Sequence, residues 1–149
     1  MRISETRTFT GIEILAEQEK FLLPFSEIKK HIKNMHCIGI DAINDEGDKI
    51  GFALLRRHNQ RGYFLLVIMI DAQYQNKGYG TEFLTEIAYY MRDMYSVETI
   101  TTTYDCNNHA SKKLFESFGF SETDVVQTDE FCEVNMSFNT RWLCNQADF

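Results

Sequence analysis

The sequence predicts a single mixed α/β (α+β) domain over residues 1–149, on three observations. The length of 149 residues suits one domain with one main core. Strand patterns follow one another in the first half, whereas helical and strand patterns alternate after residue 78. The segment Tyr63–Ile70 is almost continuously apolar, which is typical of a central strand covered on both faces.

The composition indicates an ordered globular protein. Hydrophobic residues make up 44% and charged residues 25% of the chain, which excludes disordered and low-complexity classes. The apolar run Phe64–Ile70 is far shorter than the roughly 20 residues of a membrane helix, so we expect no membrane partner. Residues Met1–Glu5 contain no apolar segment, so we expect no secretory signal and a cytoplasmic location.

Charge and cysteine content exclude further classes. A net charge of −7 leaves no basic footprint for nucleic acid, and it either favours a cationic substrate or serves solubility alone. The cysteines form no CxxC pair and no zinc-ligand spacing, so we expect no metal site and four reduced thiols, most of them packed in the core. They are Cys37, Cys106, Cys132 and Cys144.

The N-terminal quarter predicts an edge strand and two helices. The segment Arg2–Phe9 is predicted to form the edge strand. Gly11–Leu22 carries apolar residues at helical spacing, which predicts the first helix. The second helix is predicted to begin at Ser26 as its N-cap, with Ile28 and Ile32 on one apolar face.

Three strands are predicted next, joined by two turns. An acidic turn with a glycine separates the first two strands, and a polar turn ending in glycine separates the last two. The result is an antiparallel meander that ends in the buried strand. In order, these segments are His36–Ile43, Asn44–Asp48, Lys49–Arg57, His58–Gly62 and Tyr63–Ile70.

The remaining segments predict helix, strand, helix and hairpin. The first of these helices has a single apolar stripe, and Gly119 ends the second as a C′ glycine. Because a helix crosses between two neighbouring strands, those strands can be parallel. The predicted segments are Tyr79–Met94, Val97–Tyr104, Asn108–Phe118, and the hairpin strands Phe120–Val126 and Phe131–Phe138.

The loop Gln75–Gly80 joins the buried strand to a helix and predicts an anion cradle. The first turn of a helix has unpaired N–H groups and a positive dipole end, and glycines let an anion come close. The loop fits neither a Walker loop, because Lys77 precedes the glycines, nor a dinucleotide fingerprint, which needs a third glycine. It does fit Gln/Arg-x-x-Gly-x-Gly/Ala, the pattern that holds the pyrophosphate of an acyl-CoA.

A second segment makes the pattern specific. About thirty residues downstream lie Asn108, then Leu114-Phe115, then Gly119-Phe120. With both motifs in this order, residues 35–138 resemble the GNAT superfamily of acyl-CoA-dependent N-acetyltransferases. The resemblance implies a GNAT-like mixed central sheet, in which an antiparallel meander is followed by parallel strands that splay apart, flanked by about four helices.

Two short stretches are similar to bacterial spermine/spermidine (polyamine) acetyltransferases. The loop Ile70–Gly78 looks like their Ile-Asp-x-x-Tyr-Gln-x-Lys-Gly, and Gln18–Phe21 looks like their Gln-x-x-Phe. The resemblance implies direct transfer of an acetyl group from acetyl-CoA to a primary amine, with a polyamine as one candidate acceptor.

The resemblance also assigns cofactor-binding residues. The backbone of Ile68, Met69 and Ile70 would pair with the pantetheine arm, and one main-chain N–H there would polarise the thioester carbonyl. Spacing back from Leu114 assigns a further pantetheine contact to Asn108, whereas spacing forward from Tyr104 favours Asn107. The pyrophosphate would be held by Gln75, Asn76, Lys77, Gly78, Tyr79 and Gly80.

The chain departs from the family at both proton-transfer positions. Many relatives carry a Glu on the buried strand, but Tyr63–Ile70 has no carboxylate. Many also carry a Tyr where this chain has Phe115. Tyr104, at the end of a strand, is the candidate catalytic residue that remains. These departures keep a second hypothesis open, an acyl-CoA-binding module with little or no catalytic activity.

Acceptor and partner are predicted from charge and from the tail. Acidic residues on the two N-terminal helices could pair with a second ammonium of the acceptor, or they form ordinary solvated faces. The tail Arg141–Phe149 could pack on a second copy, so a homodimer is a possible state. The acidic residues are Glu13, Glu17 and Glu19 on the first helix and Glu27 on the second.

Overall fold

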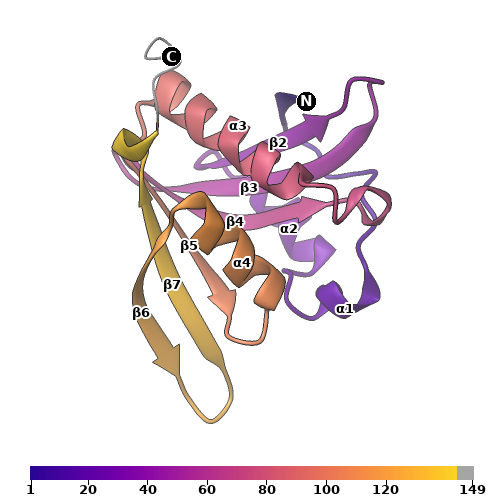
Figure 1. The fold of residues 1–149 in the computed structure, drawn as a ribbon. Helices are drawn as coiled ribbons and strands as arrows, with labels where there is room; N and C mark the ends of the chain where they lie inside the picture. The colour runs from indigo at the N-terminus through magenta and orange to yellow at the C-terminus, as the bar shows by residue number, and fades with distance from the viewer. Residues whose placement is uncertain (144–149) are drawn as a thin grey trace.

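The computed structural model describes residues 1–143 as one seven-stranded sheet with helices on both faces (Figure 1). The sheet order is β1-β2-β3-β4-β5-β7-β6. The strands are β1 (Arg2–Thr6), β2 (Cys37–Ile43), β3 (Lys49–Asn59), β4 (Gly62–Ile70), β5 (Thr99–Asp105), β6 (Ser121–Gln127) and β7 (Cys132–Asn139), and the helices are α1 (Ala16–Glu19), α2 (Phe25–His31), α3 (Tyr79–Tyr95) and α4 (His109–Phe118).

The topology confirms the predicted fold class. Strands β1 to β4 pair in antiparallel fashion, and β4 pairs with β5 in parallel after the crossover through α3. Strand β7 inserts between β5 and β6 and pairs with both in antiparallel fashion. From residue 36 onwards, the predicted helices and strands begin and end within two residues of the observed ones. No described helix is long and apolar enough to cross a membrane.

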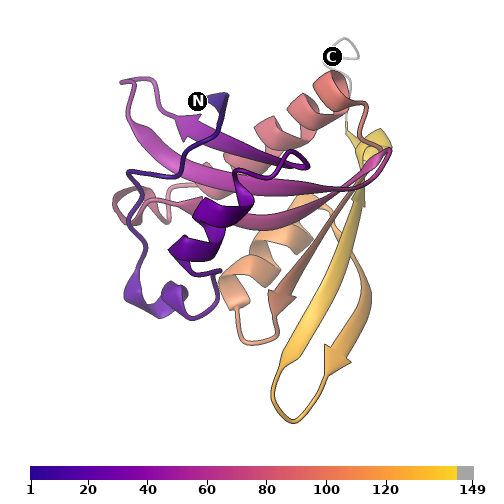
Figure 2. The ribbon, with the colours of Figure 1, turned by 180° about the vertical axis from the view of Figure 1, so that it is seen from behind.

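Two apolar cores lie on opposite faces of the sheet. Helices α3 and α4 cover one face, and α2 covers the β2–β4 part of the other, as the two opposite views show (Figures 1 and 2). The predicted stripe of α3 is buried in the first core, and Ile28 and Ile32 of the α2 segment are buried in the second. The α3 stripe consists of Phe83, Leu84, Ile87, Ala88 and Met91.

Helices α3 and α4 begin and end close to the predicted residues. Helix α3 begins after Gly78, whose φ of 83° is the left-handed conformation that glycine favours. The Asn108 side chain caps α4 by accepting a hydrogen bond from the N–H of Ser111. Gly119, at φ 119°, ends α4 and leads the chain into β6.

The predicted helix over Gly11–Leu22 is wrong in extent, because only Ala16–Glu19 is helical. Gly11 has a positive φ of 77°, and the next residues run as an irregular segment. The Glu13 N–H donates to Asp71 Oδ2 at 3.0 Å, and the Glu13 carbonyl accepts from the chain just after Asp71. These long-range hydrogen bonds replace the intrahelical ones that the spacing predicts.

The predicted N-cap of the second helix is also wrong. Helix α2 begins at Phe25, with Pro24 at the N-cap and no side-chain cap hydrogen bond, so Ser26 lies inside the first turn. The fixed φ of proline suits the start of a helix, and here that preference outweighs the capping preference of serine.

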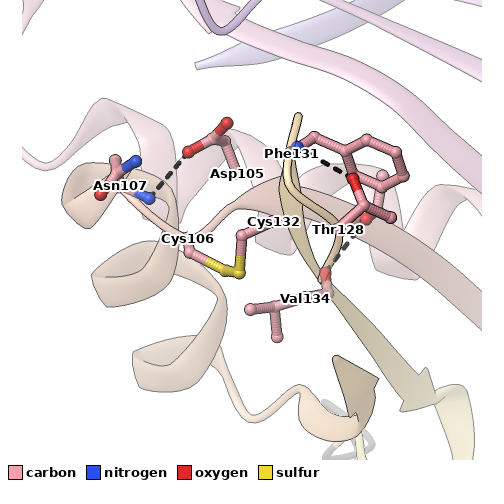
Figure 3. Close-up of a disulfide and its surroundings, with 8 residues drawn as sticks. Asp105, Cys106, Asn107, Thr128, Phe131, Cys132 and Val134 are labelled. Atoms are coloured by element: carbon pink, nitrogen blue, oxygen red, sulfur yellow. Dashed lines mark hydrogen bonds between the residues drawn. A yellow bond between two sulfur atoms is a disulfide. The ribbon is translucent and has the colours of Figure 1, made fainter. Parts of the chain in front are cut away.

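Two of the four cysteines are not reduced thiols. Cys106 and Cys132 form a disulfide with their Cα atoms 5.5 Å apart (Figure 3). They are the next two residues beyond Asp105–Glu133, the pair at the end of the β5–β7 ladder. The strand register therefore brings them together, although they are 26 residues apart in the sequence. Cys37 is a free buried thiol, as expected, and Cys144 lies outside the described residues.

Candidate functional site

The parallel strands β4 and β5 separate half-way along their length. They pair only from Gly62 opposite Thr99 to Leu65 opposite Thr102. At that last pair, Thr102 Oγ1 donates to the Leu65 carbonyl at 3.0 Å. The β3–β4 register shifts at the same point, which leaves Leu66 as a bulge. Beyond the bulge the two strands diverge (Figure 1), as the resemblance implies.

A cleft of about 320 Å³ opens where the strands diverge. Its walls come from four segments: the end of β4, the loop that leads into α3, one side of α4, and α1 with the turn after it. The lining residues are Gln18, Phe21, Leu22, Ile68, Met69, Ile70, Tyr74, Gln75, Asn76, Gly78, Tyr79, Gly80, Thr81, Asn108, Ala110, Ser111, Lys113, Leu114 and Ser117. Most of the predicted cofactor-binding residues are therefore brought together here.

The end of β4 offers backbone groups to the cleft at alternate residues. In an antiparallel pair, successive residues point their N–H and C=O groups alternately toward and away from the partner strand. Asp71 donates its N–H to β3, so Met69, two residues earlier, also faces β3. Ile68 and Ile70 therefore turn their backbone groups toward the gap. Gln75 Nε2 donates to the Ile70 carbonyl from that side at 2.9 Å.

The cradle loop has the backbone shape of an anion site. Asn76 and Gly78 both have positive φ, 61° and 83°, so the chain curls tightly before α3. No side chain caps the N-terminus of α3, so its first-turn N–H groups have no side-chain partner, and Gly78, Tyr79 and Gly80 at this positive end of the helix dipole line the cleft. Lys77 is exposed and is not a lining residue; its Nζ lies 5.9 Å from the ring centroid of Tyr74.

The Gln75 side chain is engaged with protein partners. Its amide exchanges hydrogen bonds with that of Gln18, at 2.8 Å for Gln18 Nε2 to Gln75 Oε1 and 2.7 Å for the reverse. With the bond to Ile70, both Nε2 protons of Gln75 are used. Within the cradle, Gln75 therefore holds the walls of the cleft together.

Helix α4 supplies the wall opposite β4. Asn108 is half-buried, lines the cleft and caps the helix with its side-chain oxygen, which leaves the amide NH₂ able to donate. Asn107 is exposed and does not line the cleft; its N–H bonds to Asp105 at 2.8 Å (Figure 3). Between the two asparagines, the structure brings Asn108 to the predicted site.

Tyr104, the predicted catalytic residue, is not among the lining residues. Its ring stacks on that of Phe115 with centroids 6.4 Å apart, and both are buried under α4. Burial raises the pKa of Tyr104, and the charges of Glu116 and Glu122 add to that effect. The lining contains no Asp, Glu or His, so within the described residues no carboxylate or imidazole faces the cleft.

Sequence reasoning did not place α1 in the wall of this site. Gln18, Phe21 and Leu22 line the cleft beside residues of β4 and the cradle that come at least 46 positions later in the sequence. The sequence links Gln18–Phe21 to the acceptor, through its similarity to polyamine acetyltransferases and through Glu19, but not to the cradle loop. Its distance from the cradle gives no spacing signal from which the contact with Gln75 could be predicted.

The acidic residues expected near the acceptor are scattered over the α1–α2 segment. Glu17 and Glu19 are exposed on α1, whereas Glu13 is exposed on the irregular segment before it. Glu27 pairs with Lys30 at 3.7 Å. Within residues 1–143, no three His, Cys, Asp or Glu side chains are grouped as a metal site would require.

The comparisons with known proteins identify the class. Residues 5–120 match the family model of the Acetyltransferase (GNAT) family, so the chain belongs to this family, and the prediction of a GNAT acetyltransferase is confirmed. By sequence, the chain matches none of the curated proteins.

Solved structures similar to this chain include spermidine N-acetyltransferases of Vibrio cholerae. One, in complex with CoA and spermine, is 18% identical with a TM-score of 0.67, covering 78% of this chain and 74% of that chain. A mutant of the enzyme SpeG is 18% identical with a TM-score of 0.71; the match covers 83% of this chain and 80% of that chain. A dodecameric structure is 19% identical with a TM-score of 0.65, covering 78% and 75%. These likenesses confirm the fold.

Proposed function

We propose that this chain transfers an acetyl group from acetyl-CoA directly to a primary amine. The observation that carries the proposal is the convergence, in one cleft, of two features: a helix N-terminus without a side-chain cap behind a curled loop, and the edge of β4 beyond Leu65, which no longer pairs with β5. The first suits a pyrophosphate, and the second suits the amides of a pantetheine arm. Acetyl-CoA would supply the thioester from which the acetyl group is taken.

The chain's own residues divide the work of binding. The N–H groups of Gly78, Tyr79 and Gly80 would hold the pyrophosphate, which is supported by the position of the start of α3 in the cleft lining. The gap-facing backbone of Ile68 and Ile70 is suited to pair with pantetheine and to polarise a thioester carbonyl. In this scheme Asn108 donates from the opposite wall, while Asn76 and Lys77 flank the phosphates.

The proton of the amine has two possible routes. A free alkylamine with a pKa near 10.4 is almost fully protonated at neutral pH, so a proton must leave before attack. Tyr104 is the side chain that the sequence predicts for this role, and water is the alternative. We favour water, because Tyr104 is stacked under α4 on Phe115 and the cleft lining has no carboxylate or histidine.

For the acceptor we propose a cationic amine of the polyamine type. A similar structure contains spermine together with CoA. The chain itself carries a net charge of −7, and Glu17 and Glu19 are exposed on α1, which forms one wall of the cleft. Negative potential around a binding cleft raises the local concentration of a cationic substrate.

Location and assembly are part of the same proposal. We place the enzyme in the cytoplasm, because the reaction draws on intracellular acetyl-CoA; the Cys106–Cys132 disulfide weighs against this location, since cytosolic proteins rarely keep disulfides.

We propose a homo-oligomer. A similar structure is dodecameric, so the expected dimer is one of several states. The sequence predicts that the tail Arg141–Phe149 packs on a second copy. In the described part of this tail, the Trp142 side chain is 56% exposed; residues 144–149 lie outside the described part.

A second candidate function is acyl-CoA binding without efficient catalysis. Phe115 cannot donate a proton, and Tyr104 lies outside the cleft lining, which are the observations that favour it. One experiment distinguishes the two functions. It measures CoA binding by calorimetry, and it measures acetyl-CoA consumption with spermidine, a diamine and a monoamine. Turnover with any of the three amines supports the acetyltransferase. Binding without turnover supports the binding module, and absence of both contradicts the assignment of the cleft.

A further inference from the structure

Helix α1 is fastened to the cleft by one pair of amides. The side chains of Gln18 and Gln75 exchange two hydrogen bonds of 2.8 and 2.7 Å, and both residues line the cleft and are partly buried. A reciprocal amide pair fixes both side-chain orientations, because each group is donor and acceptor at once. The two residues are 57 positions apart, so the pair connects two walls of the cleft.

Helix α1 cannot hold this position by itself. It has four residues, buries no side chain and has no side-chain cap. A helix of that length is unstable in water, because the nucleation cost is not recovered by so few hydrogen bonds. Its placement therefore depends on external contacts. The chain before it is bonded to Asp71 through the Glu13 backbone, and the chain after it contributes Phe21 and Leu22 to the cleft.

The amide pair also acts on the cradle and on β4. Gln75 is the first residue of the cradle loop, and its second Nε2 proton bonds the Ile70 carbonyl at 2.9 Å. Three segments thus meet at one amide: α1, the cradle loop and the gap-facing edge of β4. If the Gln18 contact is lost, the Gln75 side chain loses two of its three hydrogen bonds. The Phe21–Leu22 wall is then held by the packing of Leu22 on the second core and loses its hydrogen-bonded link to the cradle.

We propose that Gln18 is a positioning residue for acyl-CoA: acting through Gln75, it holds α1 as the wall of the cleft and sets the affinity for the CoA moiety. The inference rests on the proposed function. It adds to that function a residue from a segment outside both family motifs. Gln18 touches no reacting atom in this scheme, so its removal weakens binding of acetyl-CoA and leaves the maximal rate nearly unchanged.

The test is a double-mutant cycle on CoA affinity. Gln18→Leu and Gln75→Leu keep the approximate side-chain volume and remove the hydrogen bonds. Without the amide pair, CoA has to order the α1 wall as it binds, and the free energy of up to two modest hydrogen bonds is then drawn from binding. The Kd for CoA by calorimetry should therefore rise roughly five- to thirty-fold in Gln18→Leu. The double variant should be no weaker than Gln75→Leu alone, because Gln18 acts through Gln75. Gln73→Leu is the matched control, since Gln73 is exposed and is not a lining residue.

Steady-state kinetics supplies the second readout. In Gln18→Leu the KM for acetyl-CoA should rise with Kd, while kcat at saturating acetyl-CoA stays within about two-fold of the parent protein. A general loss of folding would instead reduce the active fraction, so it would lower the apparent kcat, leave the KM for acetyl-CoA unchanged and lower the melting temperature. Because α1 buries no side chain, the melting temperature should stay the same.

The outcomes separate this inference from the function on which it rests. If the unmodified protein does not bind CoA, the proposed function fails. If it binds CoA and Gln18→Leu binds equally well, the positioning role of Gln18 is contradicted while the function stands. Additive losses in the double variant would also overturn it, because they would mean that Gln18 and Gln75 act independently.

Discussion

The stacked pair Tyr104 and Phe115 determines how protons can move in this site. Phe115 occupies the α4 position at which many GNAT members carry a tyrosine, and its ring has no proton to give. Tyr104, which stacks on it, has its pKa raised by burial, so its phenol stays protonated at neutral pH. A thiolate of CoA is a tolerable leaving group, so the reaction can proceed without a dedicated acid.

The first prediction concerns Tyr104. Because its ring lies under α4 and does not line the cleft, Tyr104→Phe should leave kcat within about three-fold of the parent protein. Loss of a true acid–base group would lower kcat by roughly 10²–10⁴-fold. Steady-state rates and their pH profile distinguish the two, and a loss of that size would restore Tyr104 to the mechanism.

The second prediction concerns Gly80, the second residue of α3, whose Cα side faces Leu114 of α4. A Cβ at this position would meet the two terminal carbons of Leu114 at 3.7 and 3.9 Å, ordinary contact distances. Gly80→Ala should therefore fold and bind CoA normally. Gly80→Val adds two methyl groups that push Leu114 toward the cleft, and overpacking of this kind predicts a loss of CoA affinity of roughly ten-fold or more. Calorimetry with CoA tests both variants, and equal affinities would contradict this placement of the cofactor.

At the scale of elements, the sequence predicted those features of helices that depend on residues close together in the chain. The α3 stripe and the Gly119 end of α4 are fixed by residues a few positions apart, and both were predicted. Helix α1 and the disulfide depend on partners far away in the sequence. The Glu13–Asp71 hydrogen bond and the Cys106–Cys132 pair exist only because the sheet brings distant segments together, and no spacing pattern reports that.

The third prediction concerns the disulfide at the end of the β5–β7 ladder. Cys106 and Cys132 close a loop across 26 residues, so the cross-link lowers the entropy of the unfolded chain and stabilises the fold by about 3–4 kcal/mol. The double variant Cys106→Ser/Cys132→Ser should unfold at correspondingly lower denaturant concentration. A reductant should destabilise the parent protein and leave the variant unaffected. An equal response of both proteins to the reductant would contradict the pairing.

The fourth prediction concerns the clasp between β1 and α3. Glu5 accepts hydrogen bonds from the hydroxyls of Tyr90 and Tyr95. Burial, followed by the hydrogen bond to Glu5, raises the pKa of Tyr95 to about 12 and that of Tyr90 further. The folded state thus binds these protons more tightly than the unfolded state, whose tyrosines titrate near 10.

The sign of the pH effect follows from that difference. The stability contributed by this clasp is fully present below about pH 10 and is lost as the pH rises through about 12. Urea unfolding of the parent protein should show a stability loss over this window that is smaller in Tyr95→Phe and smallest in the Tyr90→Phe/Tyr95→Phe variant. An identical loss in all three proteins would exclude the tyrosines as its cause.

At the scale of the whole molecule, the sequence order predicted the sheet but not the walls of the site. The meander and the crossover through α3 follow from strand order and from one buried strand, and they put the end of β4 beside the cradle. The position of α1 against that cleft is a property of the completed fold. The acidic residues illustrate the same limit, because Glu13 leaves the helix on which its spacing placed it and Glu27 pairs with Lys30.

The last prediction concerns the net charge of −7 and the acceptor. Each exposed carboxylate contributes only about 0–1 kcal/mol to a surface ion pair, so charge should act mainly through the rate of association. At low ionic strength, kcat/KM should be higher for a diamine than for a neutral-tailed monoamine of equal length, and the ratio should fall as salt screens the field. Glu17→Gln/Glu19→Gln, which keeps the size of both side chains on α1, should lower the diamine preference and leave the monoamine rate unchanged. Equal kcat/KM values for the two amines at all salt concentrations would exclude a polyamine-type acceptor while leaving the acetyltransferase assignment intact.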